Sequence, residues 1–140
     1  MSHLNIQASP EEVLVLMEAS MLFYARCEYE KAEKVLRGAL VMSPGNSDIY
    51  ACLGALYHAQ DRLDEAYECY EQALKGCPSE ECARSNRATL LMQRGKAEDA
   101  IQELKRVIQE HDPSNPVVER SKELLKVAES LVTRKTGAAG

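Results

Sequence analysis

Residues 50–74 read YACLGALYHAQDRLDEAYECYEQAL, and this stretch decides the fold. Tyr50, Leu53 and Tyr57 recur at the i, i+3 and i+7 spacing that places side chains on one face of a helix. A second pattern of the same kind follows it and ends at Pro78, because proline cannot continue the hydrogen-bond ladder of a helix. The stretch therefore predicts two consecutive helices joined by a short turn.

The same pattern occurs three times along the chain at a constant interval of 34 residues. Three sets of positions share this interval: Ala32, Ala66 and Ala100; Leu36, Tyr70 and Leu104; and Ala39, Ala73 and Val107. An unbroken interval at three separate positions indicates an internal repeat. Each repeat predicts one pair of helices, and we place the borders of the three repeats at 13–46, 47–80 and 81–114.

Both ends of the repeat array carry signals of their own. Ser9 before Pro10 is a typical start of a helix, so we expect a tail and a helix start over residues 1–12. Residues 115–132 predict an amphipathic helix that covers the open face of the last repeat, as helix solenoids require. Residues 133–140 are expected to be a disordered tail. The predicted fold class is all-α: an α-solenoid of three helix hairpins and a C-terminal capping helix, seven helices in total.

Composition excludes several classes of partner. The 140 residues contain 17 Lys and Arg against 22 Asp and Glu, and this net charge of −5 argues against nucleic acid and anionic membranes. No secretory signal or long apolar run is visible. Five cysteines, an odd number without framework spacing, favour a reducing compartment. We therefore expect a cytoplasmic protein with no membrane partner and no nucleic-acid partner.

Chemistry-bearing residues do not converge in the sequence. The histidines are scattered, and no Cys–His pair has the spacing of an activated nucleophile. Cys77 and Cys82 could form a disulfide if oxidised or half of a metal site, but no second pair completes one. We expect no enzyme, no cofactor and no metal. The cysteines are interpreted as small buried or half-buried side chains, and Glu28, Glu30 and Glu33 as a solvated face.

The middle repeat resembles the tetratricopeptide repeat family. The positions that carry the resemblance are Tyr50, Leu53, Gly54, Tyr57, Ala66, Tyr70, Ala73 and Pro78. The resemblance covers about residues 13–114, although Ala19-Ser20 and Arg87-Ala88 replace the Leu-Gly pair in the outer repeats. It implies that the first helix of each hairpin lines a concave surface.

A narrower resemblance connects the chain to the small tetratricopeptide chaperones of bacterial type III secretion. That group holds translocator or export proteins in the cytosol before secretion, which implies a protein client. Another tetratricopeptide group, the co-chaperones of the large heat-shock proteins, grips an acidic C-terminus with Lys, Asn and Arg. The matching positions here carry Met17, Met21, Cys52, Cys82 and Asn86, so this set of gripping residues is absent. A client with an acidic EEVD-like tail is therefore not expected.

The groove positions are those on the first helices that the packing pattern leaves unused. They are Leu14, Met17, Met21, Tyr24, Ala51, Ala55, His58, Cys82, Asn86, Thr89, Met92 and Gln93. Methionine adapts to irregular apolar partners, and alanine leaves space for a client's side chains. The sequence thus predicts a chaperone that holds an extended apolar segment, such as that of a type III secretion translocator. The alternatives are self-association as a homodimer, a scaffold that works through its convex surface, and simple filling of the core.

Overall fold

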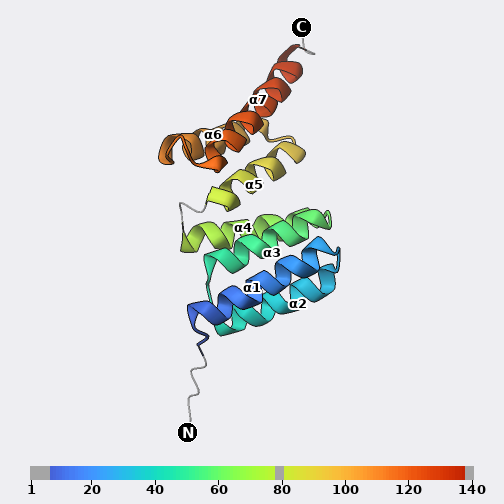
Figure 1. The fold of residues 1–140 in the computed structure, drawn as a ribbon. Coiled ribbons are helices and arrows are strands. Elements are labelled where there is room, and N and C mark those ends of the chain that lie inside the picture. The colour runs from blue at the N-terminus through green and yellow to red at the C-terminus, as the bar shows by residue number, and fades with distance from the viewer. Residues whose placement is uncertain (1–6, 78–80, 138–140) are drawn as a thin grey trace. The chain divides into compact units, whose positions relative to one another are not determined.

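The computed structural model describes residues 7–77 and 81–137, without the side chains of residues 81, 82, 136 and 137. Within these ranges the chain forms seven helices and no strand (Figure 1). They are α1 (Pro10–Ala25), α2 (Tyr29–Met42), α3 (Ser47–Ala59), α4 (Leu63–Gly76), α5 (Glu81–Gln93), α6 (Ala97–Glu110) and α7 (Pro116–Gly137). The all-α class with three hairpins and a closing helix is confirmed.

The chain divides into two compact units after Cys77. Unit 1 contains the hairpins α1–α2 and α3–α4, and α3 also packs against both α1 and α2. Unit 2 contains the hairpin α5–α6 together with α7, which packs against both of its helices. The repeat borders at 13–46, 47–80 and 81–114 stay a prediction.

The turn within each hairpin repeats the same backbone conformation. Cys27, Asp61 and Gly95, which are 34 residues apart, have positive φ angles of 60°, 60° and 77°. The residue after each of them donates its amide to a carbonyl five residues earlier, as from Arg62 to Tyr57 over 2.9 Å. This left-handed closure satisfies the last carbonyls of the first helix and turns the chain into the second helix.

The repeated apolar positions form the cores of both units. In unit 1 the side chains of Leu36, Ala39, Tyr70 and Ala73 are almost completely buried, and in unit 2 so is that of Leu104. The alanines among them, Ala39 and Ala73, are small enough to let two helices approach closely. The positions singled out by the 34-residue interval are therefore the packing positions.

Helix α7 closes unit 2 against α6. Val117 and Val118 pack with Val107 of α6 in one buried cluster, so the predicted cover of the last repeat is confirmed. We expected this helix to end at residue 132, but it continues to Gly137. No proline interrupts residues 133–137, and two basic residues in the last turn complement the helix dipole. The remaining residues of the two predicted tails, 1–6 and 138–140, lie outside the described residues.

Side chains cap the starts of α1 and α3. The Ser9 hydroxyl accepts the Glu12 amide over 3.2 Å, which confirms the predicted start of α1. The Asn46 side chain accepts the amides of Asp48 and Ile49 over 3.0 and 3.2 Å. These caps satisfy amides that have no partner within the helix and fix where α1 and α3 begin.

Candidate peptide-binding surface

An apolar cavity of about 290 Å³ opens in unit 1 between α1, α2 and α3. It is called the α1–α3 cavity below, and its lining residues are Ser20, Met21, Tyr24, Ala32, Leu36, Cys52, Ala55 and Leu56. Met21 and Tyr24 remain 63% and 43% exposed, whereas Leu36 at the base is 2% exposed. The cavity thus has an apolar base and an apolar rim that is open to a partner.

Three of the predicted groove residues, Met21, Tyr24 and Ala55, meet at this cavity. Two others, Leu14 and Met17, border a separate cavity of about 300 Å³ near the start of α1. The split arises because Leu14 and Met17 lie two turns before Met21 and Tyr24 on the same helix, beside Asn46 and Asp48 in the segment that enters α3. The remaining positions in unit 1, Ala51 and His58, are half-buried on α3.

Unit 2 holds the other predicted groove residues. Asn86, Thr89 and Met92 are half-buried on α5, and Gln93 is exposed at its end. The Asn86 side chain accepts a hydrogen bond of 2.9 Å from Arg120 of α7, which the sequence analysis did not anticipate. Met92 borders a cavity of about 330 Å³ together with Leu131 and Lys135 of α7. The side chain of Cys82, also predicted here, lies outside the described residues.

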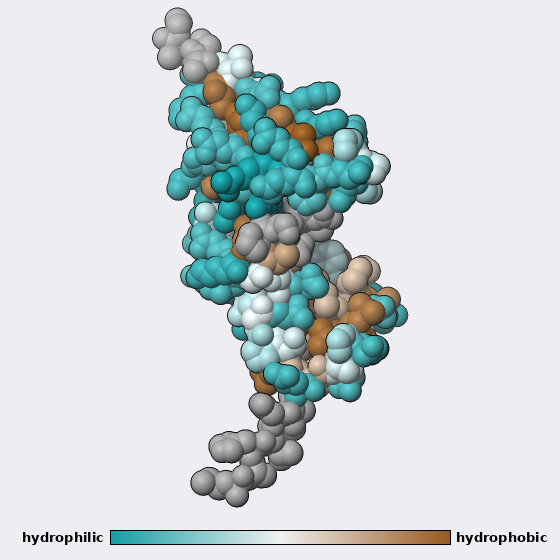
Figure 2. All heavy atoms as spheres, turned by 90° about the vertical axis from the view of Figure 1, so that its left-hand side faces the viewer, coloured by the Kyte–Doolittle hydropathy of each residue, from teal (hydrophilic) through white to brown (hydrophobic). Residues whose placement is uncertain are grey.

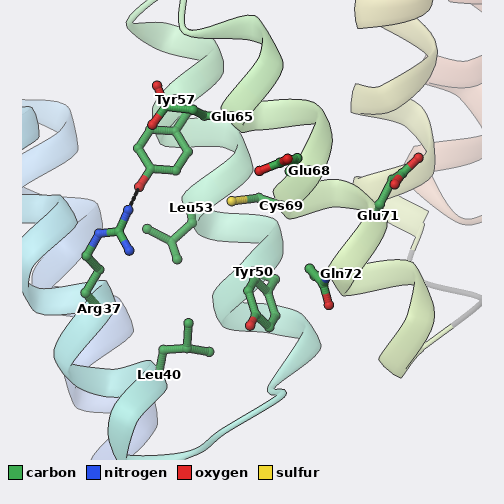
Figure 3. A pocket seen from close by; sticks show the side chains of 10 residues that line it. All are labelled: Arg37, Leu40, Tyr50, Leu53, Tyr57, Glu65, Glu68, Cys69, Glu71 and Gln72. Atoms are coloured by element: carbon green, nitrogen blue, oxygen red, sulfur yellow. Dashed lines mark hydrogen bonds between the residues drawn. The ribbon is translucent and has the colours of Figure 1, made fainter.

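A polar cluster around Tyr57 is the feature that the sequence analysis missed. The Tyr57 hydroxyl donates to Glu33 over 2.7 Å and accepts a hydrogen bond from Arg37 (Figure 3). Arg62 lies over the Tyr57 ring, 4.4 Å from its centroid, and also pairs with Glu33 over 3.5 Å. Glu33 is therefore a half-buried partner of three side chains, and its assignment to a solvated face was wrong.

The cluster shifts the proton affinities of its members. Burial by itself would raise the pKa of Glu33, but hydrogen bonds from Tyr57 and Arg37 and the charges of Arg37 and Arg62 outweigh it, so the pKa is lowered. Burial and then the hydrogen bond to Glu33 raise the pKa of Tyr57 to about 12. The cluster thus remains ionised at Glu33 and neutral at Tyr57 near pH 7, and it ties α2, α3 and α4 together.

The same cluster borders a cavity of about 440 Å³ between α2, α3 and α4. Arg37, Glu65, Glu68, Glu71 and Cys69 are among the residues that line it (Figure 3). Burial raises the pKa of the Cys69 thiol to about 11, so this thiol is protonated near pH 7 and is not an activated nucleophile. This lining is charged, in contrast to that of the α1–α3 cavity.

The described cysteines have mixed environments. Cys52, Cys69 and Cys77 are half-buried as expected, but Cys27 is exposed because it occupies the left-handed turn between α1 and α2. Within residues 7–77 and 81–137, no group of three His, Cys, Asp or Glu side chains is arranged to hold a metal ion. Among the helices described, none combines the length and the apolar character needed to cross a membrane.

Comparison of the sequence with known proteins gives one family and a set of longer relatives. The family model described as tetratricopeptide repeat matches residues 57–121. The peroxisomal targeting signal receptor of Kluyveromyces lactis is 33% identical over 109 residues, which are 78% of this chain and 19% of that receptor. The receptor of Candida glabrata is 36% identical over 62 residues, 44% of this chain and 10% of that protein. The chain therefore spans a fifth or less of the length of these relatives.

Comparison of the fold gives proteins of similar size. The Yersinia enterocolitica type III secretion chaperone SycD, in complex with a peptide of the translocator YopD, aligns with a TM-score of 0.79 at 22% identity. That alignment covers 91% of this chain and 97% of SycD. The Sgt2 tetratricopeptide domain from Aspergillus fumigatus aligns with a TM-score of 0.83 at 21% identity, covering 96% of this chain and 87% of that domain. At these identities the alignments establish the fold alone.

The sequence and fold comparisons agree with the repeat that the sequence analysis identified. The matched segment runs from the second hairpin through the third to the start of α7. The resemblance to the tetratricopeptide repeat family is thereby confirmed: the family model matches residues 57–121, and the helix hairpins share the fold of the Sgt2 tetratricopeptide domain.

Proposed function

We propose that this chain is a protein-binding module that holds an extended apolar segment of a client protein against its first helices. The observation that carries the proposal is the α1–α3 cavity, an apolar hollow whose rim residues Met21 and Tyr24 are exposed. Large exposed apolar side chains beside a cavity are typical of a site that binds a partner. A tetratricopeptide chaperone that protects a secretion client, such as a type III translocator, would have this role.

The dimensions of the α1–α3 cavity favour a peptide side chain over a small molecule. Its volume of about 290 Å³ is at the lower limit of ligand pockets, about 300 Å³, and it lacks a converging set of polar groups. An aliphatic side chain would contact Leu36 and Leu56 at the base, and Ala55 leaves room for it. Met21 can adjust its conformation to different clients because its side chain is unbranched and flexible.

An extended client would also contact residues beyond the cavity. Leu14, 55% exposed, lies two turns from Met21 on the same helix and provides a second apolar contact. Further contacts through Asn86, Thr89, Met92 and Gln93 of unit 2 remain part of the proposal. SycD, which shares the fold, was solved with a translocator peptide, and that supports a peptide as the ligand class. A protein that binds peptides in this way has no need of an enzymatic activity, so we also propose a non-enzymatic role.

The experiment compares two variants that introduce the same charge at different places. The client is first identified as the protein that co-purifies with the tagged chain from its own host. An apolar peptide from that client is then labelled, and its binding is followed by fluorescence anisotropy. Ala55→Glu places a carboxylate in the cavity and should weaken binding at least about tenfold, since burying an unpaired charge costs well over 1.4 kcal/mol.

The matched control is Val41→Glu, because Val41 is 79% exposed on α2 and does not border the cavity. This variant should bind like the wild type. If Ala55→Glu disturbs the helical circular dichroism, Tyr24→Ala at the exposed rim takes its place. Wild-type affinity in a correctly folded cavity variant would remove the α1–α3 cavity from the client site.

A scaffold that works through self-association is the second candidate. The observation in its favour is a separate pair of exposed apolar residues on α1, Val15 and Leu22, which are 63% and 64% exposed. Neither residue borders the α1–α3 cavity. A groove for a client therefore does not account for them.

A further inference from the structure

The outer face of α1 is apolar, exposed and distinct from the client cavity. Val15 and Leu22 are seven residues apart and so lie on one helical face. Their equivalents one repeat later are Ile49 and Leu56, which are 0% and 1% exposed. The same repeat position is thus buried on α3 and open to solvent on α1.

On α3, the helices α1 and α2 together bury the equivalent residues Ile49 and Leu56. Helix α3 packs against α1 and α2, and Leu56 borders the same cavity as Ala32 and Leu36 of α2. No described helix covers α1 in the corresponding way. The outer face therefore has the residues of a helix-packing surface but, among the residues described, lacks the helix that would pack on it.

Charges identify what kind of helix fits there. Glu11 and Glu18 alternate with Val15 and Leu22 at the i, i+4, i+7 and i+11 spacing, and both carboxylates are exposed. The equivalent of Glu18 on the covered helix α3 is the uncharged Cys52. A helix that packs on this face must therefore carry basic residues along an apolar stripe.

Helix α7 carries such a stripe. Val127 and Leu131 are 52% and 38% exposed. Arg134 and Lys135 lie one turn after Leu131, and both are exposed. Figure 2 shows a narrow hydrophobic stripe bordered by hydrophilic atoms in its upper part, where the chain approaches its C-terminus. This α7 stripe joins an exposed apolar pair to two basic residues, whose charge is opposite to that of the carboxylates on the outer face of α1.

We propose that the outer face of α1 binds the α7 stripe of a second copy of this chain. Val15 and Leu22 pack against Val127 and Leu131 of the other copy, and the carboxylates of Glu11 and Glu18 face its Arg134 and Lys135. Every copy has one surface of each kind, so association proceeds head to tail and continues past the dimer unless a ring closes. A symmetric contact of two α1 faces is less suitable, because Glu18 lies between the two apolar residues and would meet its own counterpart.

Analytical ultracentrifugation of the purified full chain tests the proposal. The wild type should show a mass that rises with protein concentration and falls with added salt, because salt screens the charge contacts. Leu22→Glu and Leu131→Glu should each weaken this association at least about tenfold, since each places a carboxylate in the apolar contact. Val41→Glu introduces the same charge at an unrelated exposed site and should associate like the wild type.

Mixing the two contact variants distinguishes the head-to-tail contact from a symmetric one. Leu22→Glu retains an intact α7 stripe and Leu131→Glu an intact outer face, so an equimolar mixture should form a one-to-one dimer that neither variant forms alone. A monomeric wild type at all concentrations would overturn the proposal. So would a Leu131→Glu variant that still dimerises, because this outcome indicates a symmetric α1 contact.

The client cavity is tested separately in the same experiment. Ala55→Glu should self-associate like the wild type even where it fails to bind the client peptide, because Ala55 borders the cavity and not the outer face. Leu22→Glu should in turn bind the client peptide with wild-type affinity. Loss of self-association in Ala55→Glu would contradict the separation of the two surfaces.

Discussion

The first and second hairpins form the same contact between their helices with different pairs of residues. In α3–α4, Gly54 faces the ring of Tyr70, and a Cβ at Gly54 would lie 3.0 Å from its Cζ and closer to two other ring carbons. In α1–α2 the equivalent pair is Ser20 and Leu36, 3% and 2% exposed. A smaller partner on the second helix leaves room for a larger residue on the first. The identity of each residue therefore differs between the two hairpins, whereas the combined size of the pair is preserved.

The largest expected effect comes from giving the second hairpin the serine of the first. Gly54→Ser should lower the free energy of unfolding by about 2 kcal/mol, because the added atoms overlap a fully buried ring. Urea unfolding followed by circular dichroism measures the loss. Gly38→Ser is the control, since no atom lies within 4 Å of a Cβ at Gly38. It should be neutral or slightly stabilising, because serine is a better helix former than glycine.

A double variant sharpens the comparison. Gly54→Ser combined with Tyr70→Leu reproduces the pair of the first hairpin. The loss in unfolding free energy should be smaller than the sum of the two single losses by about 1 kcal/mol or more. Additive losses would show that the two positions do not share space.

The next effect concerns the aromatic residue near the end of the first helix in these two hairpins. The Tyr57 hydroxyl bonds with Glu33 and Arg37, whereas its equivalent Phe23 has no hydroxyl and lies beside Lys31, whose ammonium is 5.8 Å from the ring centroid. Tyr57→Phe should cost about 1–1.5 kcal/mol, because a buried hydrogen bond to a charged group is lost. Phe23→Tyr is the converse variant and should gain nothing. An unchanged urea midpoint for Tyr57→Phe would mean that the arginines alone hold Glu33.

The contrast between these hairpins shows which parts of the fold a sequence can reveal. The packing ladder was predictable because Ala32, Ala66 and Ala100 repeat at a fixed interval and each must be small where two helices meet. The cluster at Tyr57 was not, because Glu33 and Arg62 are 29 residues apart and belong to different repeats. Charged residues at ordinary surface spacing give no signal of a long-range pair.

The candidate site was predictable only in part, for a related reason. Helical spacing identified Met21 and Tyr24 as positions that packing leaves unused, and the structure brings both to one cavity with Ala55. The same spacing grouped Leu14 and Met17 with them, but these border another cavity. The sequence predicts that Asn86 is open to a client, yet its side chain accepts a hydrogen bond from Arg120. Side chains of a neighbouring helix decide which cavity a residue borders and which hydrogen bonds it forms. The residue spacing within one helix does not reveal these neighbours.

A smaller effect is expected at the turns. The left-handed position is occupied by Cys27 in the first hairpin and by Asp61 in the second. Cys27→Gly should stabilise the protein by about 0.5–1 kcal/mol, because glycine adopts positive φ without the steric cost of a Cβ. Asp61→Gly should gain less, since aspartate tolerates this conformation better. Thermal unfolding of both variants ranks the gains, and an equal gain would contradict a residue-specific cost.

The smallest effect is a pH dependence carried by Glu33. Its folded pKa is lowered from the ordinary value of 4.5, so its carboxylate contributes stability that is fully present above the unfolded pKa. This contribution is lost as the pH falls through the folded pKa, because the unfolded chain then binds the proton more readily. The urea midpoint of the wild type should therefore decline from about pH 5 downward more steeply than that of Glu33→Gln.

The comparison with Glu33→Gln is needed because other carboxylates also titrate in this range. Hydrogen bonds lower the pKa of Glu65 through Arg62 and that of Asp112 through Ser114, and both groups remain in the variant. The difference between the two pH profiles therefore isolates Glu33. Parallel profiles between pH 6 and pH 3 would mean that Tyr57 and its arginines hold the protonated acid as well as the carboxylate. The contacts of the cluster would then join the two hairpins of unit 1 by shape and hydrogen bonding alone, as the uncharged packing does around Ser20 and Leu36.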